Sequence, residues 1–313
     1  MRIAVIDLGT NTFKLLVAER PEGVSTGLHI LHTEEVGVFL GRGGVEHGML
    51  TGDAMARGMD VLHALVGKAR EMGADRVGAF GTSALRNARN ADAFTVRVKE
   101  LLGLEVQIIP GEEEAGLILE GVRQAVPFGN KPMLVMDIGG GSTEFILATG
   151  KALMWKHSFE LGTTRLVERF PAIDPMDMAT QLRMAEHIDA QLEMLWPIME
   201  RHWPSALVGS AGSFDTVAAM IAMERGTPLD AEDVTLVFGN TEFDALKEKI
   251  LPMAKAQREQ LPGLPEHRTD TIIPALMLIE RVLLHGIEEL RWSRYSLKEG
   301  AAARMLNMKR DRP

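Results

Sequence analysis

Cysteine is absent from this chain of 313 residues, and aromatic residues make up only 5% of it. Without thiols the protein can form no disulfide, no thiolate metal site and no cysteine nucleophile. The absence of disulfides suits a reducing compartment, so we expect a cytoplasmic protein.

Long apolar runs are also missing, since none approaches the ~18 residues that a membrane-spanning helix requires. The charged Asp7 follows only four apolar residues at the N-terminus, so the sequence predicts no signal peptide there. The formal net charge of −9 argues against broad nucleic-acid binding. We therefore expect neither a membrane nor a nucleic acid as partner, and an anionic ligand would need a local cationic pocket or a metal ion.

The remaining composition is that of a soluble globular protein, with 46% hydrophobic and 25% charged residues. A chain of this length accommodates two domains, each with its own core. One long-period repeat supports this division. The stretch "AVIDLGTNTFKLLVA" (4–18) parallels "LVMDIGGGSTEFILA" (134–148), and in each an apolar strand ends in Asp before a glycine-containing tip. The two copies lie 130 residues apart, which is nearly half the chain, and this spacing indicates two related domains.

Apolar patterning predicts an α/β fold in both halves. In the first half we expect strands over 2–7, 12–19, 27–38, 76–81 and 105–110, and a helix over 51–72. In the second half we expect strands over 133–137, 143–149, 152–159 and 206–210, and helices over 178–202, from 213 onward, and over 241–260, 270–286 and 298–308. The turn-rich segment near 125–132 marks the boundary between the halves.

The glycine-rich tips are the strongest chemical signal. Glycine exposes backbone N–H groups that can bind phosphate, and a flanking carboxylate can hold Mg²⁺ or its waters beside it. A glycine run also serves an ordinary tight hairpin, so one tip alone leaves both interpretations open. The repetition of the Asp-Gly hairpin favours phosphate binding, with the two tips facing each other across a cleft. The candidate tip residues are Gly9, Thr10 and Asn11, and Gly139, Gly140 and Gly141.

A second signal is the acidic run "GEEE" at 111–114, which follows a predicted strand and opens a predicted helix. Acidic residues in a first helical turn are favoured by the helix dipole. The run is therefore compatible with plain capping as well as with a catalytic carboxylate.

Six motifs together resemble one family. They are "AVIDLGTNTFKLLVA" (4–18), "GTSALRNARNADAF" (81–94), "IIPGEEEAGLILEGV" (108–122), "VMDIGGGSTEFIL" (135–147), "LGTTRLVERF" (161–170) and "VGSAGSFDTVAAM" (208–220). In this order and spacing they resemble the exopolyphosphatase / guanosine pentaphosphate phosphatase (Ppx/GppA) family, within the superfamily of acetate and sugar kinases, Hsp70 and actin. The chain is similar to the short, two-domain members, which lack a further helical domain.

The resemblance implies an α/β fold of two duplicated actin-like (ribonuclease H-like) domains with an active-site cleft between them. We expect the domains at 1–128 and 129–313, with the C-terminal helix 298–310 packing back on the first. The helix over 266–277 matches a family helix and is expected to pack near the cleft. The first tip reads Gly-Thr-Asn-Thr, where family members usually have Gly-Ser-Asn-Ser.

The resemblance also implies roles for individual residues. Glu114 matches the general base that activates water, and Arg86 matches an arginine directed at the phosphate. The expected metal ligands are Asp137, Glu144 and Asp7, holding Mg²⁺ or alternatively Mn²⁺. The expected phosphate-binding residues are Gly9, Thr10, Asn11, Gly139, Gly140, Gly141 and Ser142, together with Gly209, Ser210 and Gly212 from a loop that binds adenosine in the kinases and actin.

The implied reaction is hydrolysis of the terminal phosphoanhydride of inorganic polyphosphate, with release of orthophosphate. The same chemistry on guanosine pentaphosphate (pppGpp), giving the tetraphosphate, is the nearest alternative. A polyphosphate or nucleotide phosphotransferase (kinase) and a non-catalytic polyphosphate or alarmone sensor also remain open. The family resemblance further implies a homodimer.

Overall fold

A computed structural model describes residues 1–20 and 27–307. The chain forms two compact units. Unit 1 comprises Met1–Gln124 and Tyr295–Pro313, and unit 2 comprises Ala125–Arg294. The last helix, α12 (Leu297–Asn307), belongs to unit 1 and contacts its strands. Of the helix predicted over 298–310, residues 308–310 lie outside the described part of the chain.

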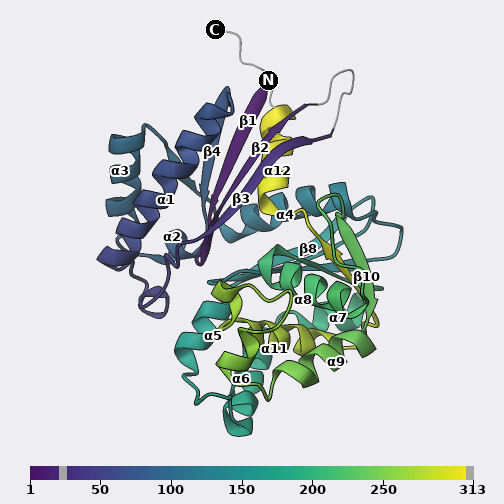
Figure 1. The fold of residues 1–313 in the computed structure, drawn as a ribbon. Helices are drawn as coiled ribbons and strands as arrows, with labels where there is room; N and C mark the ends of the chain where they lie inside the picture. The colour runs from purple at the N-terminus through teal and green to yellow at the C-terminus, as the bar shows by residue number, and fades with distance from the viewer. Residues whose placement is uncertain (21–26, 308–313) are drawn as a thin grey trace. The chain divides into compact units, whose positions relative to one another are not determined.

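Unit 1 is built on a five-stranded sheet in the order β3-β2-β1-β4-β5 (Figure 1). Its strands are β1 (Arg2–Leu8), β2 (Thr12–Glu19), β3 (His29–Gly37), β4 (Arg76–Gly81) and β5 (Val106–Ile108). The first three strands form an antiparallel meander, whereas β4 pairs parallel to β1 and β5 pairs parallel to β4. The inner strands β1 and β2 are buried on both faces, which explains their nearly continuous apolar sequences.

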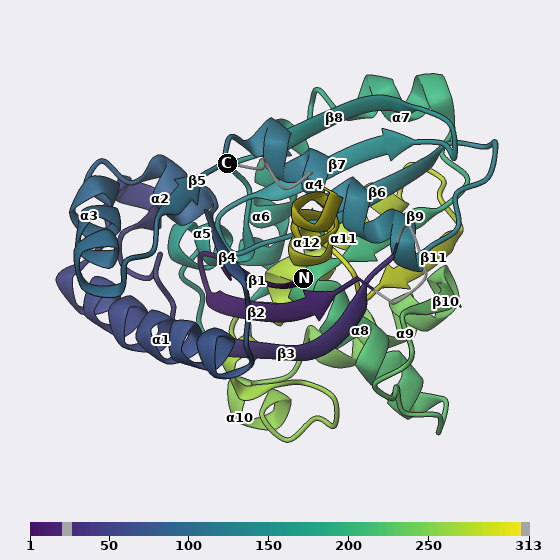
Figure 2. The same cartoon turned by 90° about the horizontal axis from the view of Figure 1, so that it is seen from above.

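Helices cover both faces of this sheet. They are α1 (Gly52–Glu71), α2 (Ser83–Asn87), α3 (Ala91–Leu102), α4 (Gly111–Ala125) and α12, with a 3₁₀ turn at Val45–His47. Figures 1 and 2 show α1 and α3 on one face and α12 on the other, against β1 and β2. The helix α1 begins where the Thr51 hydroxyl accepts a hydrogen bond from the Ala54 N–H at 3.2 Å, a side-chain cap.

Two glycines allow α4 and α12 to pack backbone against backbone. A Cβ on Gly121 would clash with the carbonyl oxygen of Ser296, and a Cβ on Gly300 would clash with that of Leu117. Arg304 of α12 also pairs with Glu120 of α4, at 2.6 Å. These contacts hold α4, whose first turn carries the acidic run, against α12 within unit 1.

Unit 2 contains a six-stranded sheet in the order β10-β11-β9-β6-β7-β8, which can be followed across Figure 2. Its strands are β6 (Met133–Ile138), β7 (Thr143–Ala148), β8 (Leu153–Phe159), β9 (Leu207–Ser210), β10 (Thr235–Gly239) and β11 (Glu289–Ser293). Its helices are α5 (Thr163–Arg169), α6 (Met178–Gln191), α7 (Trp196–His202), α8 (Ala211–Glu224), α9 (Asn240–Ile250), α10 (Lys255–Arg258) and α11 (Ile272–Leu283), with a 3₁₀ turn at Glu266–Arg268. The apolar core of this unit joins β6, β7 and β9 to α6, α8 and α11.

The two sheets repeat one another strand by strand. In both, an antiparallel meander (β1-β2-β3 and β6-β7-β8) is followed by two parallel strands beside its first strand (β4-β5 and β9-β11). Unit 2 adds β10 at the edge. The duplication expected from the sequence repeat is therefore confirmed at the level of topology.

Two secondary-structure predictions are wrong in part, and two strands were not predicted. The helix expected over 178–202 is interrupted by turns at 192–195, and Pro197 lies in the first turn of α7. Proline lacks the N–H that a continuous helix needs, but it is well placed where a helix begins. The helix expected over 241–260 likewise ends at Ile250, two residues before Pro252, and a short α10 follows. The strands β10 and β11, each of five residues, were not predicted.

Candidate active site

The first glycine tip joins β1 to β2. The N–H of Gly9 donates to the carbonyl oxygen of Thr12 at 3.1 Å, and a Cβ on Gly9 would lie only 2.9 Å from that oxygen. The carbonyl of Thr10 accepts a hydrogen bond from the N–H of Gly41 at 3.0 Å. Glycine is therefore required at the start of the turn because the chain approaches itself closely there.

The second tip, between β6 and β7, closes in the same way. The N–H of Gly139 donates to the carbonyl oxygen of Ser142 at 3.0 Å, and a Cβ on Gly139 would lie 3.1 Å from that oxygen. The equivalent bond closes the first tip, between Gly9 and Thr12. The two phosphate-loop candidates are thus copies of one turn, as the sequence repeat predicts.

The beginning of α5 orients the second tip. The carbonyl groups of its three glycines accept hydrogen bonds from Thr163, Thr164 and Arg165, at 3.0, 2.9 and 2.6 Å. Among the hydrogen bonds of the described residues, none has the N–H of Gly140 or Gly141 as donor. The carbonyl groups of the tip bond to α5, whereas the N–H groups of Gly140 and Gly141 do not donate to any described residue of the protein. The tip therefore has the polarity of an anion-binding nest.

Behind this tip, four polar side chains stand directly opposite one another on adjacent strands. In strand order they are Ser158, Glu144, Asp137 and Ser210, and we call them the acidic row. The hydroxyl of Ser158 donates to Oε1 of Glu144 at 2.7 Å, and the hydroxyl of Ser210 donates to Oδ2 of Asp137 at 2.6 Å. Glu144 is 1% exposed and Asp137 is 7% exposed. Each carboxylate is therefore buried and fixed in direction by a serine.

Two buried carboxylates in direct cross-strand register repel each other unless a cation lies between them or a proton is bound. Mg²⁺ is typically held by one or two protein carboxylates together with water and substrate phosphate. Among the described residues there is no group of three or more His, Cys, Asp and Glu side chains that could hold a metal by themselves. Asp137 and Glu144 thus fit a Mg²⁺ site that the substrate completes, rather than a closed protein cage.

Unit 1 brings together two predicted catalytic residues that are 28 positions apart. Arg86, on α2, donates from Nη1 to Oε2 of Glu114 on α4 at 2.7 Å, and also to the carbonyl of Ile109 at 3.3 Å. The side chains of Arg86 and Glu114 are only 16% and 9% exposed. A charge-assisted hydrogen bond of this kind is stronger when it is shielded from water, so the carboxylate is held in one orientation.

Burial distinguishes the three glutamates of the acidic run at the start of α4. Glu112 is exposed, and Glu113 is half-buried and pairs with Arg304 at 3.4 Å. Glu114 alone is buried and points inward to Arg86. Capping explains the first two residues, whereas a buried carboxylate paired with arginine needs a further reason.

The third loop, between β9 and α8, is tightly packed. A Cβ on Gly209 would clash with the ring of Phe214, and a Cβ on Gly212 would clash with the guanidinium of Arg268. Ala211 has a φ of +62°, in the left-handed region that non-glycine residues rarely occupy. Arg268, which the sequence analysis did not single out, thus lies against the loop whose Ser210 bonds Asp137.

Asp7 differs from the other predicted metal ligands in its surroundings. It lies at the end of β1 in unit 1, and its cross-strand partner in the register is Lys14 rather than a second carboxylate.

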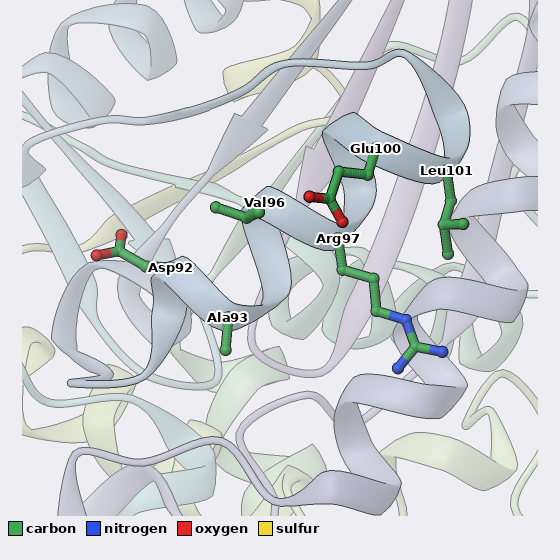
Figure 3. A pocket seen from close by; sticks show the side chains of 6 residues that line it. All are labelled: Asp92, Ala93, Val96, Arg97, Glu100 and Leu101. Carbon is green, nitrogen blue, oxygen red and sulfur yellow. The ribbon is translucent and has the colours of Figure 1, made fainter.

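The hollow beside α3, also in unit 1, contains none of the predicted site residues (Figure 3). Its lining residues are Asp92, Ala93, Val96, Arg97, Glu100 and Leu101.

Within residues 1–20 and 27–307, no helix is both long and apolar enough to cross a membrane.

Comparison with known proteins identifies the family. A model of the Ppx/GppA phosphatase family matches residues 16–309. The chain is 29% identical to exopolyphosphatase 2 of Mycobacterium tuberculosis, over 96% of this chain and 97% of that protein. It is 28% identical to guanosine-5'-triphosphate,3'-diphosphate pyrophosphatase of Photobacterium profundum, over 98% of this chain and 60% of that protein.

Solved structures agree. An exopolyphosphatase from Cytophaga hutchinsonii superimposes with a TM-score of 0.94 at 36% identity, covering 98% of both chains. A Ppx/GppA family member from Aquifex aeolicus superimposes with a TM-score of 0.79 at 26% identity, covering 99% of both chains. These matches confirm the predicted fold class of two actin-like α/β domains and the expectation of a phosphoanhydride hydrolase. The chain belongs to the Ppx/GppA phosphatase family.

Proposed function

We propose that this protein hydrolyses the terminal phosphoanhydride bond of inorganic polyphosphate and releases orthophosphate. The observation that carries the proposal is the buried pair of Arg86 and Glu114. A carboxylate fixed beside an arginine can accept a proton from water while the arginine neutralises a phosphoryl oxygen. A kinase of the same fold would transfer the phosphoryl group to an acceptor and would need no such base for water.

In this proposal Glu114 takes the proton of the attacking water, so that a P–O bond forms as the terminal P–O–P bond breaks. The shortened polyphosphate leaves with the bridging oxygen. Arg86 binds oxygens of the phosphoryl group that is transferred. Phosphoryl transfer requires little covalent chemistry from the protein, so positioning and charge supply most of the rate acceleration.

Asp137 and Glu144 would hold the metal ion, with Mg²⁺ expected and Mn²⁺ as the alternative. When bound, the cation offsets the negative charge of the phosphate oxygens. The serines of the acidic row, Ser158 and Ser210, hold the two carboxylates in their orientation. Loss of such an outer partner typically lowers metal affinity about 10- to 100-fold.

Each glycine tip would bind phosphate of the substrate through the backbone N–H groups that follow its turn-closing glycine, Gly9 or Gly139. Gly9, Thr10 and Asn11 form the first tip, and Gly139, Gly140, Gly141 and Ser142 form the second. At the third loop, Gly209, Ser210 and Gly212 were expected to bind phosphate directly. We propose instead that Ser210 acts through Asp137 and that the neighbouring Arg268 supplies the positive charge, since its guanidinium packs on Gly212.

The choice of polyphosphate over pppGpp is supported by the relatives' lengths. The mycobacterial exopolyphosphatase and this chain align over nearly all of both proteins, whereas this chain spans 60% of the Photobacterium pyrophosphatase. The pppGpp reaction is the second candidate because that relative carries its name. A homodimer and a cytoplasmic location are further proposals from the family resemblance, and sedimentation velocity of the purified protein tests the first.

The decisive experiment measures phosphate release from long polyphosphate, short polyphosphate and pppGpp with Mg²⁺. Glu114→Gln should lower kcat by roughly 10²- to 10⁴-fold, the usual contribution of a general base. The matched control is Glu113→Gln, one residue earlier on the same helix, which should retain activity. Equal activity of the two variants would rule out Glu114 as the base.

The preferred substrate decides between polyphosphate and pppGpp. Formation of ATP from polyphosphate and ADP would instead identify a phosphotransferase. Binding without turnover in the native protein would identify a sensor. Loss of release after removal of divalent cations, with recovery on adding Mg²⁺, is expected if Asp137 and Glu144 hold the metal.

A further inference from the structure

The loop that follows β3 packs directly on the first glycine tip. The N–H of Phe39 donates to the carbonyl of Asn11 at 2.7 Å. The N–H of Gly41 donates to the carbonyl of Thr10 at 3.0 Å, and a Cβ on Gly41 would lie only 2.4 Å from the Thr10 side chain. Residues 38–44, which we call the tip loop, therefore contact both residues of the tip that follow its glycine.

Within the tip loop, Phe39 adopts a backbone conformation that a bulky residue rarely takes. Its φ is +53°, in the left-handed region, and such strain persists only where neighbouring contacts hold it. Arg57 of α1 donates to the carbonyls of Val38 and Phe39, at 3.0 and 3.3 Å, and so fixes the loop from the other side. Strained residues held in this way cluster at active sites and ligand-binding sites.

The ring of Phe39 carries the guanidinium group of Arg42. The guanidinium carbon lies 4.1 Å from the ring centroid, and the N–H of Arg42 donates to the Phe39 carbonyl at 3.1 Å. Arg42 is exposed, and with residues 1–20 and 27–307 its guanidinium forms no hydrogen bond or ion pair. Stacking occupies the face of a guanidinium and leaves the N–H donors at its edge available to an anion.

The order of the strands places the tip loop and the proposed base on opposite sides of the first tip. The tip loop follows β3, the tip joins β1 to β2, and the helices with Arg86 and Glu114 follow β4 and β5. The register brings all these strand ends to the same edge of the sheet. Because β3 and β4 are three strand spacings apart, about 14 Å, several linked phosphates are needed to span this edge.

We propose that Arg42 binds a phosphate of the polyphosphate chain beyond the phosphate held at the first tip, and that it thereby favours long chains. Arginine binds phosphate oxygens through paired N–H donors, and the stack on Phe39 fixes the plane of those donors. The terminal phosphate would lie at Arg86 and Glu114, and the chain would continue past the tip to Arg42. This inference rests on the proposed function, which supplies polyphosphate as the substrate.

The test measures steady-state phosphate release from long polyphosphate and from tripolyphosphate with Mg²⁺. Arg42→Gln should raise KM for long polyphosphate about 3- to 10-fold and leave kcat within about twofold, as expected for a charged hydrogen bond at an exposed site. KM for tripolyphosphate should stay within about twofold, because three linked phosphates are too short to reach from the base to Arg42.

The matched control is Arg97→Gln, which removes the same charge from an exposed arginine of unit 1. Arg97 lies in the hollow beside α3, away from the predicted site residues, so both KM values should remain those of the native protein. An unchanged KM for long polyphosphate in Arg42→Gln, or an equal rise for the two substrates or for the two variants, would overturn the inference and leave the proposed reaction intact. A native protein that releases no phosphate from either substrate would instead overturn the proposed function.

Phe39→Leu tests whether the ring acts through Arg42. Loss of the stack should raise KM for long polyphosphate about 2- to 5-fold in the native background, and it should add nothing in the Arg42→Gln background. Additive effects of the two substitutions would contradict the role of the stack. Circular dichroism establishes that each variant is folded, and the Arg42→Gln comparison is decisive even if Phe39→Leu does not fold.

Discussion

Arg86 and Glu114 are held together at 2.7 Å, although one lies on α2 and the other on α4. The contact orients the buried carboxylate and places a fixed positive charge next to it. The sequence analysis assigned each residue its own role, and the structure shows that the two side chains form one ion pair in unit 1.

Replacing Arg86 with lysine should therefore impair the reaction even though the charge is kept. Lysine has no planar fork of donors and cannot bond Glu114, the Ile109 carbonyl and phosphate with the same geometry. We expect kcat/KM for phosphate release to fall by about 10²-fold, the usual effect of removing one oriented donor. Arg89→Lys is the control, because Arg89 is exposed and lies three residues further along the chain. Similar losses in both variants would mean that Arg86 has no special part in the reaction.

Ser210→Ala should weaken metal binding without removing a ligand. Its hydroxyl donates to Oδ2 of Asp137 at 2.6 Å, and loss of such a partner typically lowers metal affinity about 10- to 100-fold. Mg²⁺ titration calorimetry measures the effect. Ser205→Ala is the matched control, since the exposed Ser205 hydroxyl bonds only the Pro132 carbonyl, at 3.0 Å. Unaltered Mg²⁺ affinity in Ser210→Ala would exclude a supporting role for this serine.

Gly300→Ala should destabilise unit 1 by forcing α12 away from α4. The added Cβ would clash with the carbonyl of Leu117, and overpacking of this kind typically costs about 1–3 kcal/mol. By contrast, Gly67→Ala within α1 meets no atom within 4 Å and should stabilise by roughly 0.5–1 kcal/mol. Urea denaturation midpoints should shift in opposite directions. An unchanged or raised midpoint in Gly300→Ala would contradict the close helix contact.

The pair of Arg225 and Glu242 makes a small, pH-dependent contribution to stability. Hydrogen bonds from the Arg225 guanidinium, and one from the N–H of Gly239, lower the pKa of Glu242 below its ordinary value of 4.5. A carboxyl group with a lowered pKa stabilises the fold above pH 4.5, and this contribution is lost as the pH falls through the lower, folded-state pKa.

Glu242→Gln should accordingly reduce the free energy of unfolding at neutral pH, and the difference from the native protein should shrink towards about pH 3. Because both side chains are more than a third exposed, we expect an effect of only about 0.5 kcal/mol. Glu232→Gln, in an exposed loop of the same unit, is the control. A difference that stayed constant from pH 7 to acid would exclude the charge of Glu242 as its source.

The sequence by itself determined the elements whose chemistry is local. Glycine is needed where a hairpin folds back on its own carbonyl, so the repeated tips at Gly9 and Gly139 were readable from residue type alone. The apolar strands that precede them end in carboxylates at the same offset, and this established the duplication. Long helices such as α1 also followed from periodicity, because a stripe of apolar side chains specifies one buried face.

Other features depend on contacts between distant segments, which local sequence does not encode. The acidic run at the start of α4 was compatible with capping or catalysis until burial and Arg86 separated Glu114 from its neighbours. Arg268 was overlooked because an arginine at the end of a short 3₁₀ turn has no pattern that points to the loop at Gly212.

The pairing of β7 with β8 shows most clearly which features the sequence determined and which only the tertiary structure decided. Its carboxylates Glu144 and Asp137 were evident in the sequence, but Ser158 was not singled out. A bulge between Leu147 and Ala148 shifts the pairing of β7 and β8 by one residue, so that Ser158, and not His157, stands opposite Glu144. Local composition identifies which groups can bind a metal or a phosphate, since that depends on their chemistry. The tertiary structure decides which of them meet, because strand register and helix packing are set by the whole fold.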